Sequence, residues 1–586
     1  MAAVHRRMRA VGVVACVMWC GLAATARADL PPAMDRAPAE ALGIVAMRDI
    51  GQFHKRLSEY MGLFDLEADT PPLSVIGELV ATPGLARGGS AMVVILPPTA
   101  GESDPRPVLV APVSDTAMFA KSLNAQGQGI MTATLDGDEV FMKDAGGGYV
   151  VMSPDRGTVE SFTLGVNSAA AMKQSMGATA ARASDQADLV IYLTPGLVNQ
   201  GLEAVGEGMV EQVGAMSMVL GPGAAPGAAM SRASEMMSER FEADGQSMVI
   251  TMSADDVGLV IDFVSQFKEG TPSARMFQVD GSARSLASAL PDGKMLLAGS
   301  VDTSSPMLKS WMREMKADEA GALAMLAPMF DSMEKIDGMA MSIGVPPAGL
   351  MGGMLTAGTT FIKTADPKGL TNAVKTAMEG MNGRAAGGGK IAASYKAGAV
   401  DAGGVKVDSW QFTVPMDNMD PNAMGAQQMQ MMLFGMAPGP SGLIGATDKG
   451  VVMSIGSNSQ LMGSAMQAAA GGKGMTGQDA FASVHSRLQD DRIFEVYVGV
   501  KGIIDMIGPF MAMQTGGAPI RTPEKLAPVA LAGTMSGGAM GIRLVMPRDV
   551  LLLLGDVTAE MRGAMDDMDD DMDGDMDDQD AGPPRF

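Results

Sequence analysis

The sequence repeats itself at long range, and this repetition constrains the fold more than any other feature. The strand-like run GSAMVVILPP at residues 89–98 returns 249 positions later as GMAMSIGVPP at residues 338–347. Residues 38–49 match residues 291–302 in the same way, at an offset of 253. Self-similarity at a nearly fixed offset indicates two copies of one structural unit. We therefore expect two related modules in tandem.

The later elements of the first copy recur in the same order. The second copy contains roughly fifty extra residues, because the offset jumps from about 250 to about 300 between its third and fourth elements. Two stretches supply them, residues 383–404 and 415–441, and we expect both to be long surface loops. The matches are residues 108–115 with 359–366, Val150–Ser153 with Val451–Ser454, Leu189–Tyr192 with Phe494–Tyr497, and Met248–Met252 with Ile542–Met546.

Each copy alternates short apolar runs with amphipathic stretches, separated by Gly and Pro turns. Residues 139–152 are typical of an antiparallel hairpin that turns at the glycines 146–148. The fold class we predict is α+β, with each module a mostly antiparallel sheet and its helices packed on one face. The modules are predicted to span residues 29–285 and 286–562.

The first 28 residues have the pattern of a secretory signal peptide. Basic residues precede the apolar stretch Val11–Ala24, and Ala26 and Ala28 are small residues in the positions that a cleavage site requires. The stretch is short for a transmembrane helix, and an uncleaved anchor is the alternative. We therefore expect an exported protein of the periplasm, cell envelope or extracellular space. A mature chain would have no transmembrane segment.

The composition excludes several kinds of chemistry. Both cysteines, Cys16 and Cys20, lie in the predicted signal, so a mature chain would have no disulfide and no thiolate site. His54 and His485 are its only histidines. The formal net charge of −23 repels phosphate backbones, so we do not expect nucleic-acid binding. The sequence identifies no particular partner, and an envelope protein is the candidate that we keep.

Four aspartates follow strand-like runs and precede helix-like ones. In these positions a carboxylate can accept hydrogen bonds from the free amides of the first helical turn. Because the positions recur in both copies, we interpret the four as helix caps rather than as acid–base catalysts, which a protein usually needs once. The four are Asp49, Asp115, Asp302 and Asp366.

Other motifs are weak. Ser265 and Lys268 have the Ser-x-x-Lys spacing of penicillin-recognising serine enzymes, which would place both on one helical turn, but the companion motifs are missing. His54 and His485 each follow apolar residues in amphipathic stretches, where a structural histidine is expected. The sequence gives no catalytic residue and no organic cofactor.

The C-terminal segment, residues 563–586, is predicted to be a disordered acidic tail rich in Asp and Met. Part of it fits the oxygen-ligand spacing of a calcium loop, with a glycine at position six. The candidate Ca²⁺ ligands are Asp569, Asp571, Asp573 and Asp580.

Methionine is unusually frequent, with 57 in 586 residues. Because the methionines are spread over the whole chain, we interpret them as flexible core filler. Copper(I) binding is the alternative, since thioethers are soft ligands. The densest cluster for it is Met424, Met429, Met431, Met432 and Met436.

The order of elements resembles a family of exported bacterial domains of unknown function. The resemblance covers most of a mature chain and rests on pattern rather than on a diagnostic motif. It implies no assigned activity and no catalytic residue. It is carried by residues 35–39, the strand 108–110 with Asp115, the hairpin at 146–148, and residues 150–153 and 188–192.

These observations favour a non-catalytic binding or structural scaffold that is exported to the envelope or periplasm. The alternatives are a hydrolase whose active-site residues meet only in the folded protein, and a weak binder of calcium or copper. A single-copy cleft that holds ionisable residues with shifted pKa values would favour the hydrolase. Shallow symmetric grooves would favour the scaffold.

Overall fold

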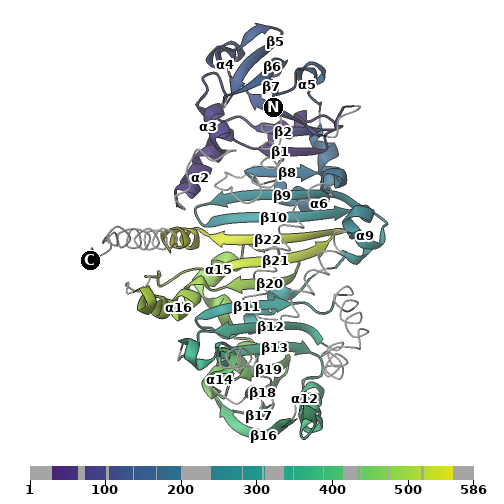
Figure 1. Cartoon of the computed structure of the whole chain (residues 1–586). Coiled ribbons are helices and arrows are strands. Elements are labelled where there is room, and N and C mark those ends of the chain that lie inside the picture. Colours follow the sequence, from purple (N-terminus) through teal and green to yellow (C-terminus); the bar gives the residue numbers. More distant parts are fainter. Residues whose placement is uncertain are drawn as a thin grey trace, which may run out of the picture.

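The computed structural model shows an α+β fold dominated by one antiparallel sheet of 20 strands (Figure 1). A separate two-stranded sheet pairs β14 (Ala385–Ala386) with β15 (Gly389–Lys390). The structure describes residues 29–557 except for 64–72, 100–103, 136, 167, 186, 199–238, 280, 306–308, 310–335, 348, 387–388, 414–431, 436–438, 473 and 516–520.

The first ten strands form one half of the large sheet. From its outer edge inward, their order is β4-β5-β6-β7-β3-β2-β1-β8-β9-β10. They are β1 (Gly43–Met47), β2 (Ala91–Leu96), β3 (Arg106–Pro112), β4 (Gln126–Gln128), β5 (Ile130–Leu135), β6 (Asp138–Gly146), β7 (Tyr149–Ser153), β8 (Leu189–Leu193), β9 (Gly245–Asp255) and β10 (Gly258–Phe267).

The other half has the order β16-β17-β18-β19-β13-β12-β11-β20-β21-β22 from its outer edge inward. Position by position, this arrangement repeats that of the first half, with β11, β12 and β13 in the places of β1, β2 and β3. Its strands are β11 (Met295–Val301), β12 (Ile336–Gly344), β13 (Gly358–Thr364), β16 (Ala392–Ala402), β17 (Val405–Thr413), β18 (Ser441–Thr447), β19 (Gly450–Ile455), β20 (Arg492–Val498), β21 (Val529–Ser536) and β22 (Ala539–Pro547).

The two halves meet where β10 pairs with β22 in the middle of the sheet (Figure 1). Asp262 on β10 lies directly opposite Arg543 on β22. Two hydrogen bonds join them, from Arg543 Nε to Asp262 Oδ1 (2.7 Å) and from Arg543 Nη2 to Asp262 Oδ2 (3.0 Å). Asp262 is buried, and a bidentate pair of this kind fixes geometry as well as neutralising the charge.

The turn from β21 to β22 shows why neighbouring strands pair as hairpins. Gly537 and Gly538 form a two-residue connection, and both have positive φ (62° and 73°). A two-residue turn of this type matches the natural twist of two antiparallel strands, and it needs residues that tolerate positive φ.

Helices cover both faces of the first half, which corrects the prediction of one covered face. Phe53 and Leu57 pack in the same core cluster as Met47 and Ile191 of the sheet, whereas Met176 packs in a second cluster on the opposite face. The strands of this half are apolar on both faces, so both must be covered. Its helices are η1 (Pro32–Arg36), α2 (Ile50–Leu63), α3 (Leu73–Ala81), α4 (Thr116–Ser122), α5 (Arg156–Ser161), α6 (Ser168–Ser184) and α9 (Pro272–Met276).

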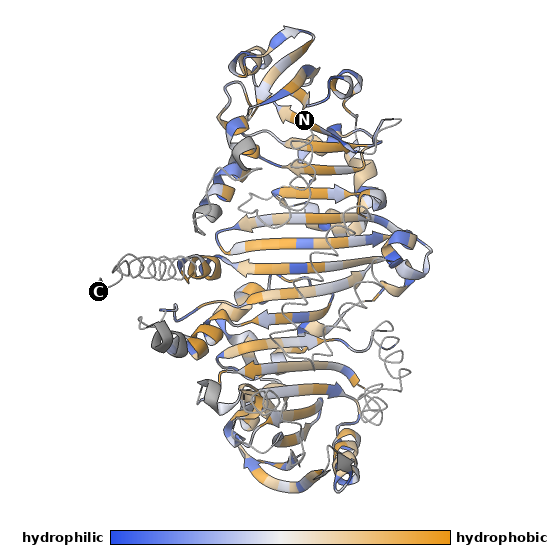
Figure 2. Ribbon diagram, in the orientation of Figure 1, coloured by the Kyte–Doolittle hydropathy of each residue, from blue (hydrophilic) through white to orange (hydrophobic). Residues whose placement is uncertain are grey.

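In the second half, one cluster joins sheet and helices. Met462 and Phe481 pack with Phe361 and Tyr497 of the sheet. Apolar residues run along the strands across the sheet (Figure 2). The helices are η2 (Ala283–Ser285), η3 (Ala287–Ala289), η5 (Gly349–Gly352), η6 (Met354–Ala357), α12 (Pro367–Met381), α14 (Ser459–Ala469), η8 (Gly474–Gly477), α15 (Asp479–His485) and α16 (Val500–Thr515).

The structure corrects two further predictions. Residues 383–404 are not a long loop, because β16 pairs with β17 as a hairpin at the outer edge of the sheet. Met248–Met252 lies in β9, whereas Ile542–Met546 lies in β22, and the strand that occupies the place of β9 is β21. The second predicted loop, 415–441, lies mostly outside the described residues.

Candidate functional site

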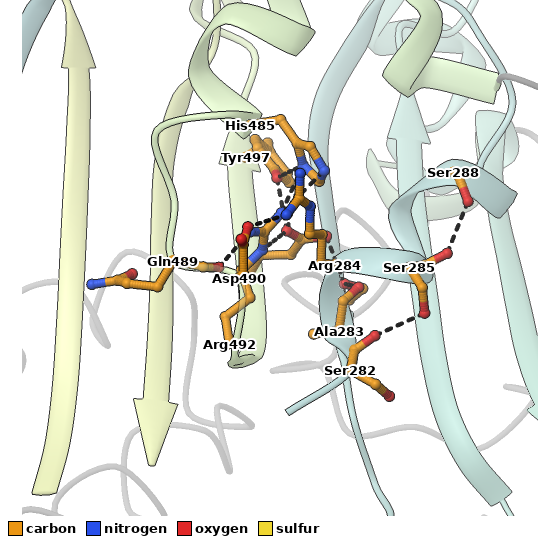
Figure 3. A network of polar contacts seen from close by, with 12 residues as sticks. Ser282, Ala283, Arg284, Ser285, Ser288, His485, Gln489, Asp490, Arg492 and Tyr497 are labelled. Carbon is orange, nitrogen blue, oxygen red and sulfur yellow. Dashed lines mark hydrogen bonds and ion pairs between the residues drawn. The ribbon is translucent and has the colours of Figure 1, made fainter. Parts of the chain in front are cut away.

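A buried polar network joins the end of α15 to strand β20 (Figure 3). His485 Nδ1 lies 2.6 Å from Tyr497 Oη, and Tyr497 donates to Glu495 Oε2 at 2.8 Å. The same carboxylate accepts a bond from Arg492 Nε, and its second oxygen accepts one from Ser300 Oγ at 2.9 Å. The network therefore connects three elements: α15, β20 and β11.

Local backbone geometry brings these side chains together. Glu495 and Tyr497 are two positions apart on β20, so they point to the same face of the sheet. A register shift in the pairing of β20 with β21, between Arg492 and Phe494, brings Arg492 to the same carboxylate. Arg492 and Glu495 are both fully buried (0% exposed).

Burial shifts the pKa of three groups next to Arg492, namely Glu495, Tyr497 and His485. It raises the pKa of Glu495, although Arg492 and three hydrogen bonds oppose this. It also raises the pKa of Tyr497, with the Glu495 charge acting in the same direction. Burial, reinforced by Arg492 and Arg284, lowers the pKa of His485 to about 4. His485 is therefore neutral at pH 7.

The hydrogen bonds assign the tautomer of His485. Tyr497 gives its single proton to Glu495, so its oxygen must accept from His485, and Nδ1 carries the proton. Arg492 Nη2 lies 3.0 Å from Nδ1 and 3.1 Å from Nε2, so the guanidinium lies over the face of the imidazole. Phe481 also stacks on this ring, with 5.5 Å between centroids. The imidazole is thus held on several sides.

A shallow, open pocket of about 430 Å³ lies beside this network. Its rim combines hydroxyl groups with one exposed ion pair, between Arg284 and Asp490. His485 is the member of the network that reaches it (Figure 3). The pocket is lined by Ser282, Arg284, Ser285, Ser288, Thr476, His485 and Asp490.

The first half has a different arrangement at the equivalent strand. Tyr192 on β8 hydrogen-bonds to Ser175 on α6 (2.8 Å), where Tyr497 meets a histidine. Asp188, just before β8, pairs with Arg56 at 3.6 Å and accepts from Ala254 N at 3.2 Å. The histidine network therefore breaks the similarity between the halves.

Three of the four predicted cap aspartates bond to helical amides. Asp49 accepts from Gln52 N (2.8 Å), Asp115 from Met118 N (2.9 Å) and Asp366 from Gly369 N (2.8 Å). These carboxylates hold helix ends, as the sequence predicts.

Asp302, the fourth of these aspartates, bonds to two serines instead. It is buried, and it accepts four hydrogen bonds, two from the amide and hydroxyl of Ser282 and two from those of Ser304. The two bonds from Ser282 hold the rim of the pocket against the end of β11. The residues that would form the first turn of the predicted helix, 306–308, lie outside the described residues.

The other motifs have no catalytic setting. Ser265 lies in strand β10, so Ser265 and Lys268 do not share a helical turn. His54 lies on α2, where burial lowers its pKa. In the described part of the chain, no group of three or more His, Cys, Asp or Glu could hold a metal ion. Within that same part, no helix is long and apolar enough to cross a membrane.

The metal candidates lie almost entirely outside the described residues. This applies to the four calcium candidates, Asp569, Asp571, Asp573 and Asp580, and to the methionine cluster apart from Met432. Met432 is exposed (45%).

Sequence reasoning missed Arg492, Glu495 and the serines of the rim. A charged pair within an apolar strand is a signal for a buried network, because such charges need partners inside the protein. Ser282, Ser285 and Ser288 recur every three residues, which is the period of a 3₁₀-helix, and two short 3₁₀-helices are found there. Either pattern could have directed attention to this region.

Comparisons with known proteins give little. No family model matches the chain, and no curated protein matches it. A solved structure described as "Structure of crystal form I of TP0453" is 8% identical, covers 41% of this chain and 80% of its own, and superposes with a TM-score of 0.20. A likeness this weak carries no information about function.

Proposed function

We propose that this protein is an exported, non-catalytic binding scaffold of the periplasm or cell envelope. The observation that supports its non-catalytic character is the setting of His485. Its Nδ1 proton is directed to Tyr497, and the Arg492 guanidinium lies over the face of the ring, 3.1 Å from Nε2. A general base works best when its pKa is near the operating pH, and burial together with this guanidinium lowers the pKa of His485 to about 4.

In this proposal, the scaffold consists of two copies of one module. The strand order that the halves share supports this duplication, and so does the register of the paired strands. Val45 pairs with Val93 in the first half, and Ala298 pairs with Ser342 in the second, at the offsets of 253 and 249 found in the sequence. Residues 92–96 and 341–344 thus lie in strands with the same neighbours in both halves.

A hydrolase is the second candidate, and the position of His485 favours it. This histidine lines a pocket together with serine hydroxyls. Ser285 and Ser288, however, donate to backbone carbonyls at 2.9 and 2.8 Å rather than to the imidazole. A serine nucleophile needs a base in hydrogen-bond contact, so the geometry favours the scaffold.

One experiment tests both parts of the proposal. The full chain is expressed with a C-terminal tag in a bacterial host, the cells are fractionated, and the protein is treated with a fluorophosphonate, which labels activated serines. We expect a periplasmic protein whose N-terminus is Asp29 and which is not labelled. Cytoplasmic retention would contradict export. Labelling that disappears in the variant His485→Gln would establish the hydrolase instead.

A further inference from the structure

The serine hydroxyls on the rim of the pocket beside His485 are all used as donors within the protein. Ser282 donates to Asp302 Oδ2 (2.5 Å). Ser285 donates to the carbonyl of Ser282 (2.9 Å), and Ser288 donates to the carbonyl of Ser285 (2.8 Å) (Figure 3). A hydroxyl has one proton and two lone pairs. Each serine therefore presents lone pairs, and no proton, to a molecule in the pocket.

The charges on the rim balance. Arg284 forms an ion pair with Asp490, and both side chains are exposed (46% and 82%). They add one strong donor and one strong acceptor, with no net charge. His485 contributes none at pH 7, because Arg492 and burial keep it neutral. The rim as a whole is therefore neutral, and most of its polar side-chain atoms are acceptors.

This chemistry selects among ligand classes. An anion would meet serine oxygens that have no proton to donate, and it would have to compete with Asp490 for Arg284. A cation would be repelled by the positive charge of Arg284. A neutral molecule with several hydroxyl groups satisfies the rim, because each hydroxyl can donate to a serine or to Asp490 and can accept from Arg284. The volume of about 430 Å³ is within the range of small-molecule sites.

We propose that this pocket binds a small neutral polyhydroxyl ligand of the sugar or polyol class. Ser282, Ser285, Ser288 and Asp490 act as acceptors, and Arg284 acts as donor. The proposal rests on the binding function proposed above and gives it a ligand class. The pocket is open and shallow, so we expect a weak complex with a dissociation constant in the millimolar range.

Saturation-transfer NMR on the full chain tests the proposal, because it detects weak ligands of large proteins. The neutral probes are glucose and myo-inositol, and the charged comparators are glucose 6-phosphate and choline. The test variants are Ser285→Ala and Ser288→Ala. The matched control is Ser483→Ala, since Ser483 is also an exposed helical serine that donates to a carbonyl three residues back (2.8 Å) but does not line the pocket.

We expect transfer to glucose or myo-inositol, weakened about fivefold in each test variant and unchanged in the control, because each variant removes one hydrogen bond to the ligand. Three results would overturn the proposal: no transfer to either neutral probe, equal transfer in the test variants and the control, or stronger transfer to a charged comparator. None of these would affect the location of the protein or its response to the fluorophosphonate, so the broader proposal is tested separately.

Discussion

Arg492 is the residue on which the buried network depends. Its guanidinium neutralises Glu495, which is buried to the same degree. In the variant Arg492→Met the carboxylate keeps its burial but loses its counter-charge, and we expect the free energy of unfolding to fall by about 3–5 kcal/mol. Urea denaturation measures this change.

Arg284→Met is the control, because the ion pair of Arg284 with Asp490 is exposed. An exposed pair contributes about 0–1 kcal/mol. Equal losses in the two variants would contradict a buried, charge-coupled network.

His485 makes the stability of the protein depend on pH. Its pKa is about 4 in the folded protein, against an ordinary value of 6.5 in the unfolded chain. The unfolded chain therefore binds the proton more readily, and stability falls as the pH drops from about 6.5 towards 4. The full effect is about 3 kcal/mol. Denaturation curves at several pH values measure it.

The variant His485→Gln isolates this contribution. Glu495 has a raised pKa, which acts in the opposite direction, as stability lost when the pH rises through that value. Because Glu495 is present in both proteins, we expect the difference between the two curves to show the histidine titration. Parallel curves between pH 4 and 6.5 would contradict this prediction, because they would show that folding does not lower the pKa of His485.

At the scale of elements, Asp302 and Asp366 each follow a strand, but their hydrogen bonds stabilise different parts of the fold. Asp366 provides one cap bond to an exposed helix end, so Asp366→Ala should cost about 1 kcal/mol. Asp302 is buried with four hydrogen bonds, so Asp302→Ala should cost about 3 kcal/mol, because the Ser282 and Ser304 donors lose their partner. Thermal unfolding of both variants compares them. A smaller loss for Asp302→Ala would contradict this assignment.

The elements show where sequence reasoning works and where it fails. Asp115 and Asp366 were predictable as caps, because capping depends on a few neighbouring residues. Residues 392–402 were not predictable as a strand, because they contain five alanines and one glycine, which have low strand propensity. Pairing with β17 stabilises this strand, and such long-range contacts override local propensity. The histidine network was missed for a related reason: its members come from three elements.

At the scale of the whole molecule, the repetition in the sequence predicted a repeated set of elements but not how they join. The junction of β10 with β22 unites strands more than 270 residues apart, and no local pattern encodes such a pairing. The match of Met248–Met252 with Ile542–Met546 failed because alternating apolar strands resemble one another whatever their place in a sheet.

The central claim is that the two halves form one continuous sheet through β10 and β22, and a cross-linking experiment tests it directly. Ser265 lies opposite Met540, and directly paired strand residues are close enough for a disulfide. Two double variants are made in a chain whose Cys16 and Cys20 are changed to serine: Ser265→Cys with Met540→Cys, and Ser265→Cys with Leu544→Cys as the displaced control. Mass spectrometry after mild oxidation should find a disulfide in the first and none in the second. A disulfide in the control alone, or none in either, would contradict the continuous sheet.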